Sequence, residues 1–197
     1  MEAGCLALMA RPPAETAGLI EAVLPALGLD AGSDRWPAAN LHQSFSSGDP
    51  ADREPALRRV LAQLHAPAFD LLFNRVSLGD RWLLRAQGVP SGFARLLAEV
   101  RAAMAAEGIG DDSSHTPHVT LCDLPPFVQE GSRWLPSPIR WRVDAIELVA
   151  VARHPYRYET LARQPLPSPP QGELFDAPLP PPHAFPQRTA TQDIPWD

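Results

Sequence analysis

The sequence carries one pattern twice, as Asn40-Leu41-His42-Gln43-Ser44-Phe45 and as Thr116-Pro117-His118-Val119-Thr120-Leu121. In each copy a histidine follows an apolar residue or proline, and a hydroxyl residue comes two positions after the histidine. Side chains two positions apart on a β-strand lie on the same face of the sheet. Each copy therefore predicts a strand that presents one imidazole and one hydroxyl to one side and apolar side chains to a core.

Two such strands around one small volume would be equipped to cleave a phosphodiester. Imidazole titrates near neutral pH, so one of His42 and His118 can act as an acid while the other acts as a base. Each proton transfer is typically worth about 10²- to 10⁴-fold in rate. The hydroxyls of Ser44 and Thr120 can donate hydrogen bonds to phosphate oxygens. Either motif alone is weak evidence, because a single histidine of this kind is more often a packed or surface residue.

The rest of the chain alternates between strand and helix patterns. We expect strands over 5–9, 41–46, 118–124 and 139–151, and helices over 13–27, 50–64 and 91–107. A β-hairpin is expected over 69–86, and the segment 156–161 could form a second hairpin with the strand at 139–151. Neither a glycine-rich phosphate loop nor regular βαβ spacing is present. An α+β fold with antiparallel sheets is therefore expected, rather than a doubly wound sheet.

The composition changes near residue 164. Ten of the 24 prolines lie in 164–197, and that stretch has no sustained apolar periodicity. We therefore expect a folded domain over 1–163 and a proline-rich, disordered tail over 164–197.

Net charge and composition limit the kinds of binding partner and cofactor that we expect. The net charge is −6, and all 17 basic residues are arginine. A protein held to polynucleotide by its overall field is usually basic, so only a local contact with an RNA end or a nucleotide is expected, and no DNA. The chain has neither a membrane-length apolar run nor a basic leader, and Cys5 and Cys122 lack zinc-finger spacing. We expect a cytoplasmic monomer without membrane contact, metal ion or cofactor.

The paired motifs at 40–45 and 116–121 resemble the His-x-Thr/Ser signatures of the 2H phosphoesterase superfamily, and more narrowly of its bacterial 2′-5′ RNA ligase family. The likeness covers most of 4–163. It implies two pseudo-symmetric α+β lobes, each lining a central cleft with one motif. It also implies metal-independent opening of 2′,3′-cyclic phosphates, at RNA ends or on small nucleotides, to 2′-phosphates, together with reversible 2′-5′ ligation. In that chemistry we assign His42 as the acid and His118 as the base.

The sequence departs from the usual family pattern at several positions. Gln43 is polar where an apolar residue is frequent, and Ser44 stands where threonine is usual. Many members carry an arginine beside the second motif, which this chain lacks. Another residue must then meet the phosphate charge, and the candidates are Arg81, Arg85, Arg153 and His115.

Some interpretations remain open at this point. Trp82 either stacks on a nucleobase or packs in the core, and His115 either enters the cleft or lies in a surface loop. The alternative function is a nucleotide-binding or RNA-end-binding module without catalytic activity. A third possibility is an adaptor whose proline-rich tail recruits a partner.

Overall fold

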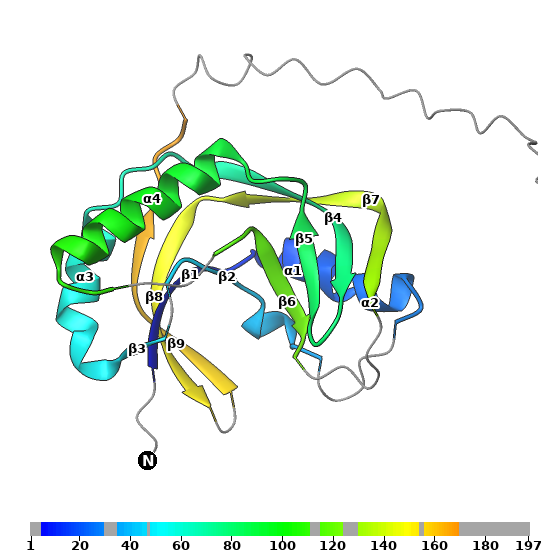
Figure 1. The fold of residues 1–197 in the computed structure, drawn as a ribbon, viewed down its shortest axis with the longest axis horizontal. Coiled ribbons are helices and arrows are strands. Elements are labelled where there is room, and N and C mark those ends of the chain that lie inside the picture. Colours follow the sequence, from blue (N-terminus) through cyan, green and yellow to red (C-terminus); the bar gives the residue numbers. More distant parts are fainter. Residues whose placement is uncertain are drawn as a thin grey trace, which may run out of the picture.

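The computed structural model describes residues 5–29, 35–46, 48–110, 115–123, 130–153 and 156–169. Their strands form two antiparallel sheets (Figure 1). The first sheet has the order β2-β1-β8-β9, with β3 also paired to β1; its strands are β1 (Cys5–Ala10), β2 (Gln43–Ser44), β3 (Asp49–Pro50), β8 (Ala145–Arg153) and β9 (Tyr156–Pro165). The second sheet has the order β6-β5-β4-β7; its strands are β4 (Phe69–Leu78), β5 (Trp82–Ala86), β6 (His118–Cys122) and β7 (Gly131–Val143). The predicted α+β fold with two antiparallel lobes is confirmed.

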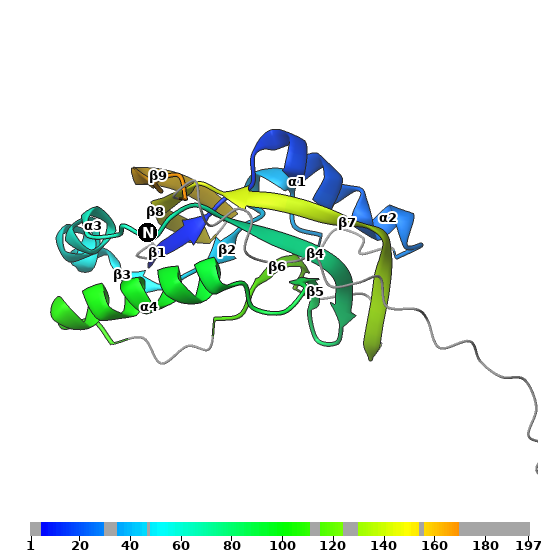
Figure 2. The same cartoon turned by 90° about the horizontal axis from the view of Figure 1, so that it is seen from above.

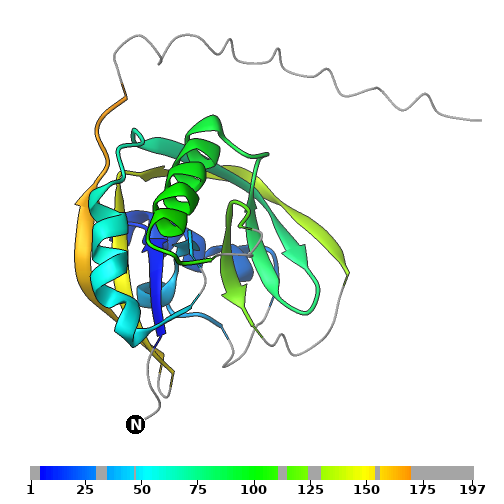
Figure 3. The same cartoon turned by 60° about the vertical axis from the view of Figure 1, so that its left-hand side comes forward.

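The helices lie outside the sheets. They are α1 (Ala14–Glu21), α2 (Val23–Ala26), η2 (Ala38–Asn40), η3 (Ala51–Arg53), α3 (Glu54–Ala62) and α4 (Ser91–Ala106). Figure 2 shows α4 on one side of the sheets and α1 and α2 on the other, and Figure 3 shows α3 beside α4. Their apolar faces and the inner faces of both sheets form one main core, in which Trp82 and Trp141 are the largest fully buried side chains.

The segment 139–151, expected to be one strand, is divided between the two sheets. β7 ends at Val143 and pairs with β4, whereas β8 begins at Ala145 and pairs with β1 and β9. The positions that join the main core shift phase at this junction, from Trp141 and Val143 to Ile146 and Leu148. A strand that keeps one face toward the core keeps its phase, so the shift marks a break between strands. The expectation of a single strand was wrong.

Two other boundaries differ from expectation. The strand expected over 41–46 is reduced to β2, and the helix expected from residue 50 begins only at Glu54. Both segments nevertheless bury the apolar side chains that the sequence pattern predicted, including Leu41, Phe45, Leu57 and Leu61.

The folded part of the chain extends past the expected boundary at 164. Gln164 lies within β9 opposite Ile146, and Leu166 is buried. The backbone N–H of Leu166 donates to the carbonyl of Asp144 at 2.7 Å, and the N–H of Ala68 donates to the carbonyl of Pro167 at 2.7 Å. These pairings attach 164–167 to the domain, so the start of the tail was placed too early. Residues 170–197 of the predicted tail lie outside the described residues.

Candidate active site

His42 lies between η2 and β2, on the face of the chain opposite the core. Leu41, Gln43 and Phe45 are buried, whereas His42 and Ser44 are only half-buried. Ser44 pairs with Met9 of β1, which holds the motif at the edge of the first sheet. The predicted alternation of the first motif is therefore present, although the regular strand is only two residues long.

The His42 ring is held by one hydrogen bond and two aromatic neighbours. Its Nδ1 lies 2.7 Å from the carbonyl oxygen of Asn40. The Trp36 ring centroid is 5.5 Å from the imidazole centroid, and the Tyr158 centroid is 5.3 Å away in an edge-on arrangement. A carbonyl can only accept, so Nδ1 carries the hydrogen and Nε2 is the atom that can exchange a proton with a ligand.

His118 begins β6 and repeats this geometry. Its Nδ1 lies 2.7 Å from the carbonyl oxygen of Thr116, again the residue two positions earlier. Val119 and Leu121 are buried, and His118 and Thr120 are half-buried on the other face. The two histidines therefore share one tautomer, and each leaves Nε2 for a ligand.

The Gln43 side chain joins the two motifs. It is fully buried, and its Oε1 accepts a hydrogen bond from the backbone N–H of His118 at 2.6 Å. Its Nε2 donates to the carbonyls of Ser44 at 2.8 Å and Thr116 at 3.3 Å. The two copies of the motif, one from each sheet, are thus brought together by direct contact.

The pKa of His42 is lowered from its ordinary value, chiefly because burial disfavours the charged ring. The Asn40 carbonyl and the Asp123 carboxylate oppose this shift, and the Arg11 cation adds to it.

The pKa of His118 is also lowered, again mainly by burial. The Thr116 carbonyl opposes this shift, whereas Arg85, His42 and His115 each lower the pKa further by repulsion between positive charges. A carboxylate thus favours the proton on His42, while the charged groups acting on His118 are all cationic.

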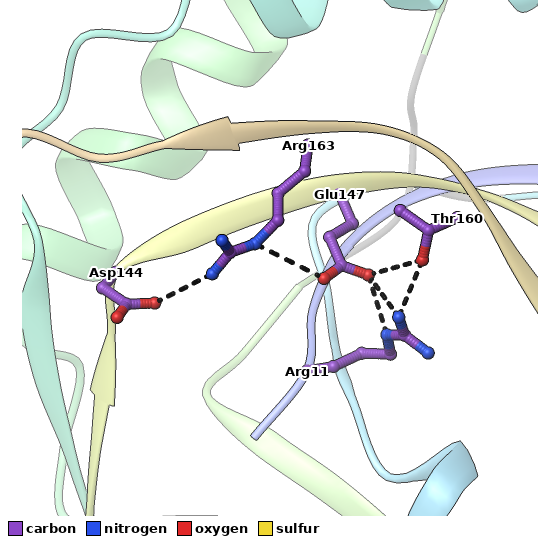
Figure 4. Close-up of polar contacts among 5 residues, drawn as sticks. All are labelled: Arg11, Asp144, Glu147, Thr160 and Arg163. Carbon is purple, nitrogen blue, oxygen red and sulfur yellow. Dashed lines mark hydrogen bonds and ion pairs between the residues drawn. The ribbon is translucent and has the colours of Figure 1, made fainter. Parts of the chain in front are cut away.

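Arg11, whose charge acts on His42, belongs to a polar network with Glu147 (Figure 4). Its Nη2 lies 2.7 Å from Glu147 Oε2, and Thr160 Oγ1 donates to the same carboxylate oxygen at 3.0 Å. Arg163 joins Glu147 Oε1 to Asp144 Oδ1, both at 3.7 Å. The network ties the end of β1 to β8 and β9, and Glu147 offsets the positive charge of Arg11.

The four residues that the sequence offered to bind the phosphate differ in their position relative to His118. Arg85 lies opposite His118 in the sheet, and its Nη1 donates to Thr116 Oγ1 at 2.8 Å. Arg81 is 67% exposed and pairs with Asp123 at 3.4 Å, so its charge is offset. His115 is half-buried and near enough to lower the pKa of His118. The side chain of Arg153 lies outside the described residues.

The remaining candidates are two hydroxyls and one tryptophan. Ser44 and Thr120 are half-buried, and within the described part of the chain no hydrogen bond is formed by either hydroxyl. Trp82 is 0% exposed, so its interpretation as a base-stacking surface was wrong and the core alternative is confirmed.

Several site residues were not predicted as such. They are Asp123, Trp36 and Tyr158. Asp123 accepts a hydrogen bond from Trp36 Nε1 at 2.8 Å, and its charge raises the pKa of His42. The rings of Trp36 and Tyr158 contact the His42 ring. Asp123 lies two residues after the second motif, so its position was a usable signal. The pairing of β9 with β8, which confirms the hairpin expected over 156–161, places Tyr158, but its contact with His42 was not predicted.

Among the described residues, no three His, Cys, Asp or Glu side chains form a group that could hold a metal ion. No helix in these same segments has both the length and the apolar character needed to cross a bilayer. The expectations of a monomer and of a cytoplasmic location stay predictions.

No family model and no curated protein matches the sequence. Solved structures do match the fold. A crystal structure of a phosphoesterase superposes with a TM-score of 0.70 at 25% identity, covering 85% of this chain and 100% of its own. The structure of Escherichia coli LigT complexed with 3′-AMP superposes with a TM-score of 0.68 at 25% identity, covering 84% of this chain and 99% of LigT. TT0787 of Thermus thermophilus superposes with a TM-score of 0.65 at 20% identity, covering 83% of this chain and 98% of its own. At this identity the likeness is one of fold alone.

Proposed function

Because this chain belongs to the 2H phosphoesterase superfamily, we propose that it opens 2′,3′-cyclic phosphates to 2′-phosphates, at RNA ends or on small nucleotides. The observation that carries the proposal is the equivalence of the two histidines. Each imidazole donates from Nδ1 to the carbonyl two residues earlier, at 2.7 Å in both cases, and so offers Nε2 to a ligand.

The two histidines divide the proton transfers between them. His118 Nε2 takes a proton from the attacking water while the new bond between water oxygen and phosphorus forms. His42 Nε2 gives a proton to the 3′ oxygen as its bond to phosphorus breaks, which leaves the phosphate on the 2′ oxygen. This order follows the electrostatics, since Asp123 favours the proton on His42 and Arg85 disfavours one on His118.

The same geometry accommodates ligation. A 5′ hydroxyl in the place of water would attack the cyclic phosphate with the same two proton transfers, and the product would be a 2′-5′ linkage. Charge on the non-bridging oxygens would be met by the hydroxyls of Ser44 and Thr120 and by Arg85 beside His118. The LigT complex with 3′-AMP supports a nucleotide as the kind of ligand that this fold accepts.

The test is turnover of a 2′,3′-cyclic nucleotide in the presence of EDTA, with the product analysed for the position of its phosphate. We expect a 2′-phosphate from the wild type and no product from a variant carrying both His42→Ala and His118→Ala. His65→Ala is the matched control, because His65 is exposed and lies after α3. Turnover retained in the double variant would overturn the proposal. Tight binding without turnover by the wild type would instead support the binding-module alternative.

A further inference from the structure

A row of four side chains crosses the second sheet and begins at the active site. Arg85 pairs with His118, Arg75 pairs with Arg85, and Trp134 pairs with Arg75. Paired residues of antiparallel strands present their side chains to the same face of the sheet. The strands that carry them, β6, β5, β4 and β7, are neighbours in this order (Figure 1). We call His118, Arg85, Arg75 and Trp134 the cross-sheet row.

The cross-sheet row extends well beyond one phosphate group. Neighbouring strands lie about 4.8 Å apart, so three spacings separate His118 from Trp134 by roughly 14 Å. A ligand that contacts both ends of the row must therefore continue past the phosphate bound at His118.

The two arginines of the row have no acidic partner among the residues that the structure describes. In the described segments no carboxylate pairs with Arg75 or Arg85, in contrast to Arg11, Arg35, Arg58, Arg59, Arg81, Arg95, Arg140, Arg142 and Arg163. Arg75 Nη1 donates only to neutral oxygens, those of Asn74 at 3.2 Å and Ala86 at 3.5 Å. Two adjacent guanidinium groups without a counter-charge repel each other and favour an anionic ligand, which arginine can bind through two parallel hydrogen bonds.

Trp134 closes the row with an exposed aromatic surface. Its side chain is 66% exposed, the highest value among the exposed large apolar residues. The Arg75 guanidinium lies over the ring, 5.7 Å from the ring centroid, which orients the indole. Because the ring stays exposed in this contact, it retains surface on which a nucleobase can stack.

We propose that the cross-sheet row binds the RNA strand that leads to the terminal phosphate. Arg85 stays at the terminal phosphate beside His118, Arg75 contacts the next phosphodiester of the strand, and Trp134 stacks on a base. The inference rests on the proposed function and gives it a substrate class, oligoribonucleotides rather than free cyclic mononucleotides. The terminal nucleotide of the strand is a ribonucleotide, because a 2′,3′-cyclic phosphate requires a ribose 2′ oxygen.

The kinetic test compares kcat/KM for a tetranucleotide ending in a 2′,3′-cyclic phosphate with kcat/KM for the cyclic mononucleotide. We expect the wild type to prefer the tetranucleotide. Trp134→Ala should lower this ratio by about tenfold to a hundredfold, the usual range for one stacked base. Arg133→Gln is the matched control, because Arg133 pairs with Val76 on the opposite face of the sheet. A wild-type ratio near one, or an unchanged ratio in Trp134→Ala, would overturn the inference.

A binding test separates this inference from the proposed function. The probe is a 5′-labelled tetranucleotide ending in a 2′-phosphate, followed by fluorescence anisotropy. Trp134→Ala should weaken its binding, and Arg75→Gln should reduce the slope of log K against log salt by about 0.7. If no cyclic phosphate is hydrolysed but both variants still show these effects, the row is supported and the proposed hydrolysis fails. If hydrolysis occurs and neither variant alters binding, the inference alone fails.

Discussion

Gln43 and His118 donate hydrogen bonds to the same acceptor, the carbonyl oxygen of Thr116, at 3.3 and 2.7 Å. Gln43 also accepts a hydrogen bond from the His118 backbone at 2.6 Å. One side chain of the first motif therefore holds the backbone of the second motif on either side of Pro117. Since Gln43 is fully buried, water cannot replace these bonds when the side chain is changed.

Gln43→Leu should impair both folding and catalysis. It removes the acceptor of the His118 backbone N–H, which costs about 1–3 kcal/mol of unfolding free energy. It also releases the backbone that places His118, and a small misplacement of a catalytic group lowers the rate by up to about 10²-fold. We expect kcat to fall with little change in KM. Urea unfolding and steady-state kinetics measure the two effects.

Gln43→Glu separates placement from simple loss of stability. It keeps an acceptor for the His118 N–H, but it adds a carboxylate beside the ring. That charge should raise the pKa of His118, so the acidic limb of the kcat/KM profile should move to higher pH. If the Glu variant kept the wild-type profile, Gln43 would have only a packing role.

The roles of the two histidines can be separated with a leaving group that needs no acid. On a 3′-deoxyribonucleoside 2′-(p-nitrophenyl phosphate), which keeps the phosphate on the 2′ oxygen and has no internal nucleophile, His42→Ala should lose much less activity than on a 2′,3′-cyclic phosphate, where about 10²- to 10⁴-fold is expected. His118→Ala should lose similar activity on both substrates, because the nucleophile must still be deprotonated. The opposite result would exchange the assignments of acid and base.

The Asp123 carboxylate should raise the pKa of His42, the proposed general acid. Asp123→Asn removes the carboxylate that raises the pKa of His42, while the amide oxygen still accepts the hydrogen bond from Trp36 Nε1. The pKa of His42 should fall, and the alkaline limb of the kcat/KM profile should move to lower pH. NMR titration of the imidazoles measures the shift directly. Asp80→Asn, at an exposed hairpin position, is the control, and an equal shift in both variants would contradict the assignment.

The buried imidazoles should also make stability depend on pH. His42 and His118 have folded-state pKa values below the ordinary value of about 6.5. As pH falls through 6.5, the unfolded chain takes up protons that the folded chain does not, so unfolding becomes easier. The decline should end once the pH lies below the lowered values, where the folded chain is protonated as well.

A double variant tests the source of this dependence. With His42→Asn and His118→Asn, an amide N–H can still donate to the backbone carbonyl, but no group titrates in this range. The free energy of unfolding should then change less than in the wild type between about pH 7.5 and pH 5.5. An unchanged dependence would show that other groups cause it.

The parts of the site that the sequence predicted are those set by local alternation. Buried Val119 and Leu121 on one side of the strand place His118 and Thr120 on the other, whatever the remainder of the chain does. The position of Gln43 also held information, because a polar residue at a core position requires a hydrogen-bond partner. Its partner lies 75 residues away in sequence, and no local pattern identifies it.

The pairing between distant strands could not be predicted in the same way. The β4–β5 hairpin is expected from its turn at Gly79-Asp80, which brings Arg75 opposite Arg85. The pairing of β4 with β7 joins segments that are far apart in the sequence, and it alone places Trp134 beside Arg75. The cross-sheet row is therefore visible only in the three-dimensional structure.

The Arg11–Glu147 contact should contribute measurably to stability. Glu147 is 13% exposed and receives Arg11 at 2.7 Å and Thr160 at 3.0 Å. Glu147→Gln should therefore lower the free energy of unfolding by about 1–3 kcal/mol, a range that allows for solvent screening at the partly exposed Arg11. Glu54→Gln breaks an exposed pair with Arg58 and should cost no more than about 0.5 kcal/mol. Urea unfolding compares the two variants, and equal costs would mean that the Arg11–Glu147 network is no stronger than an ordinary surface ion pair.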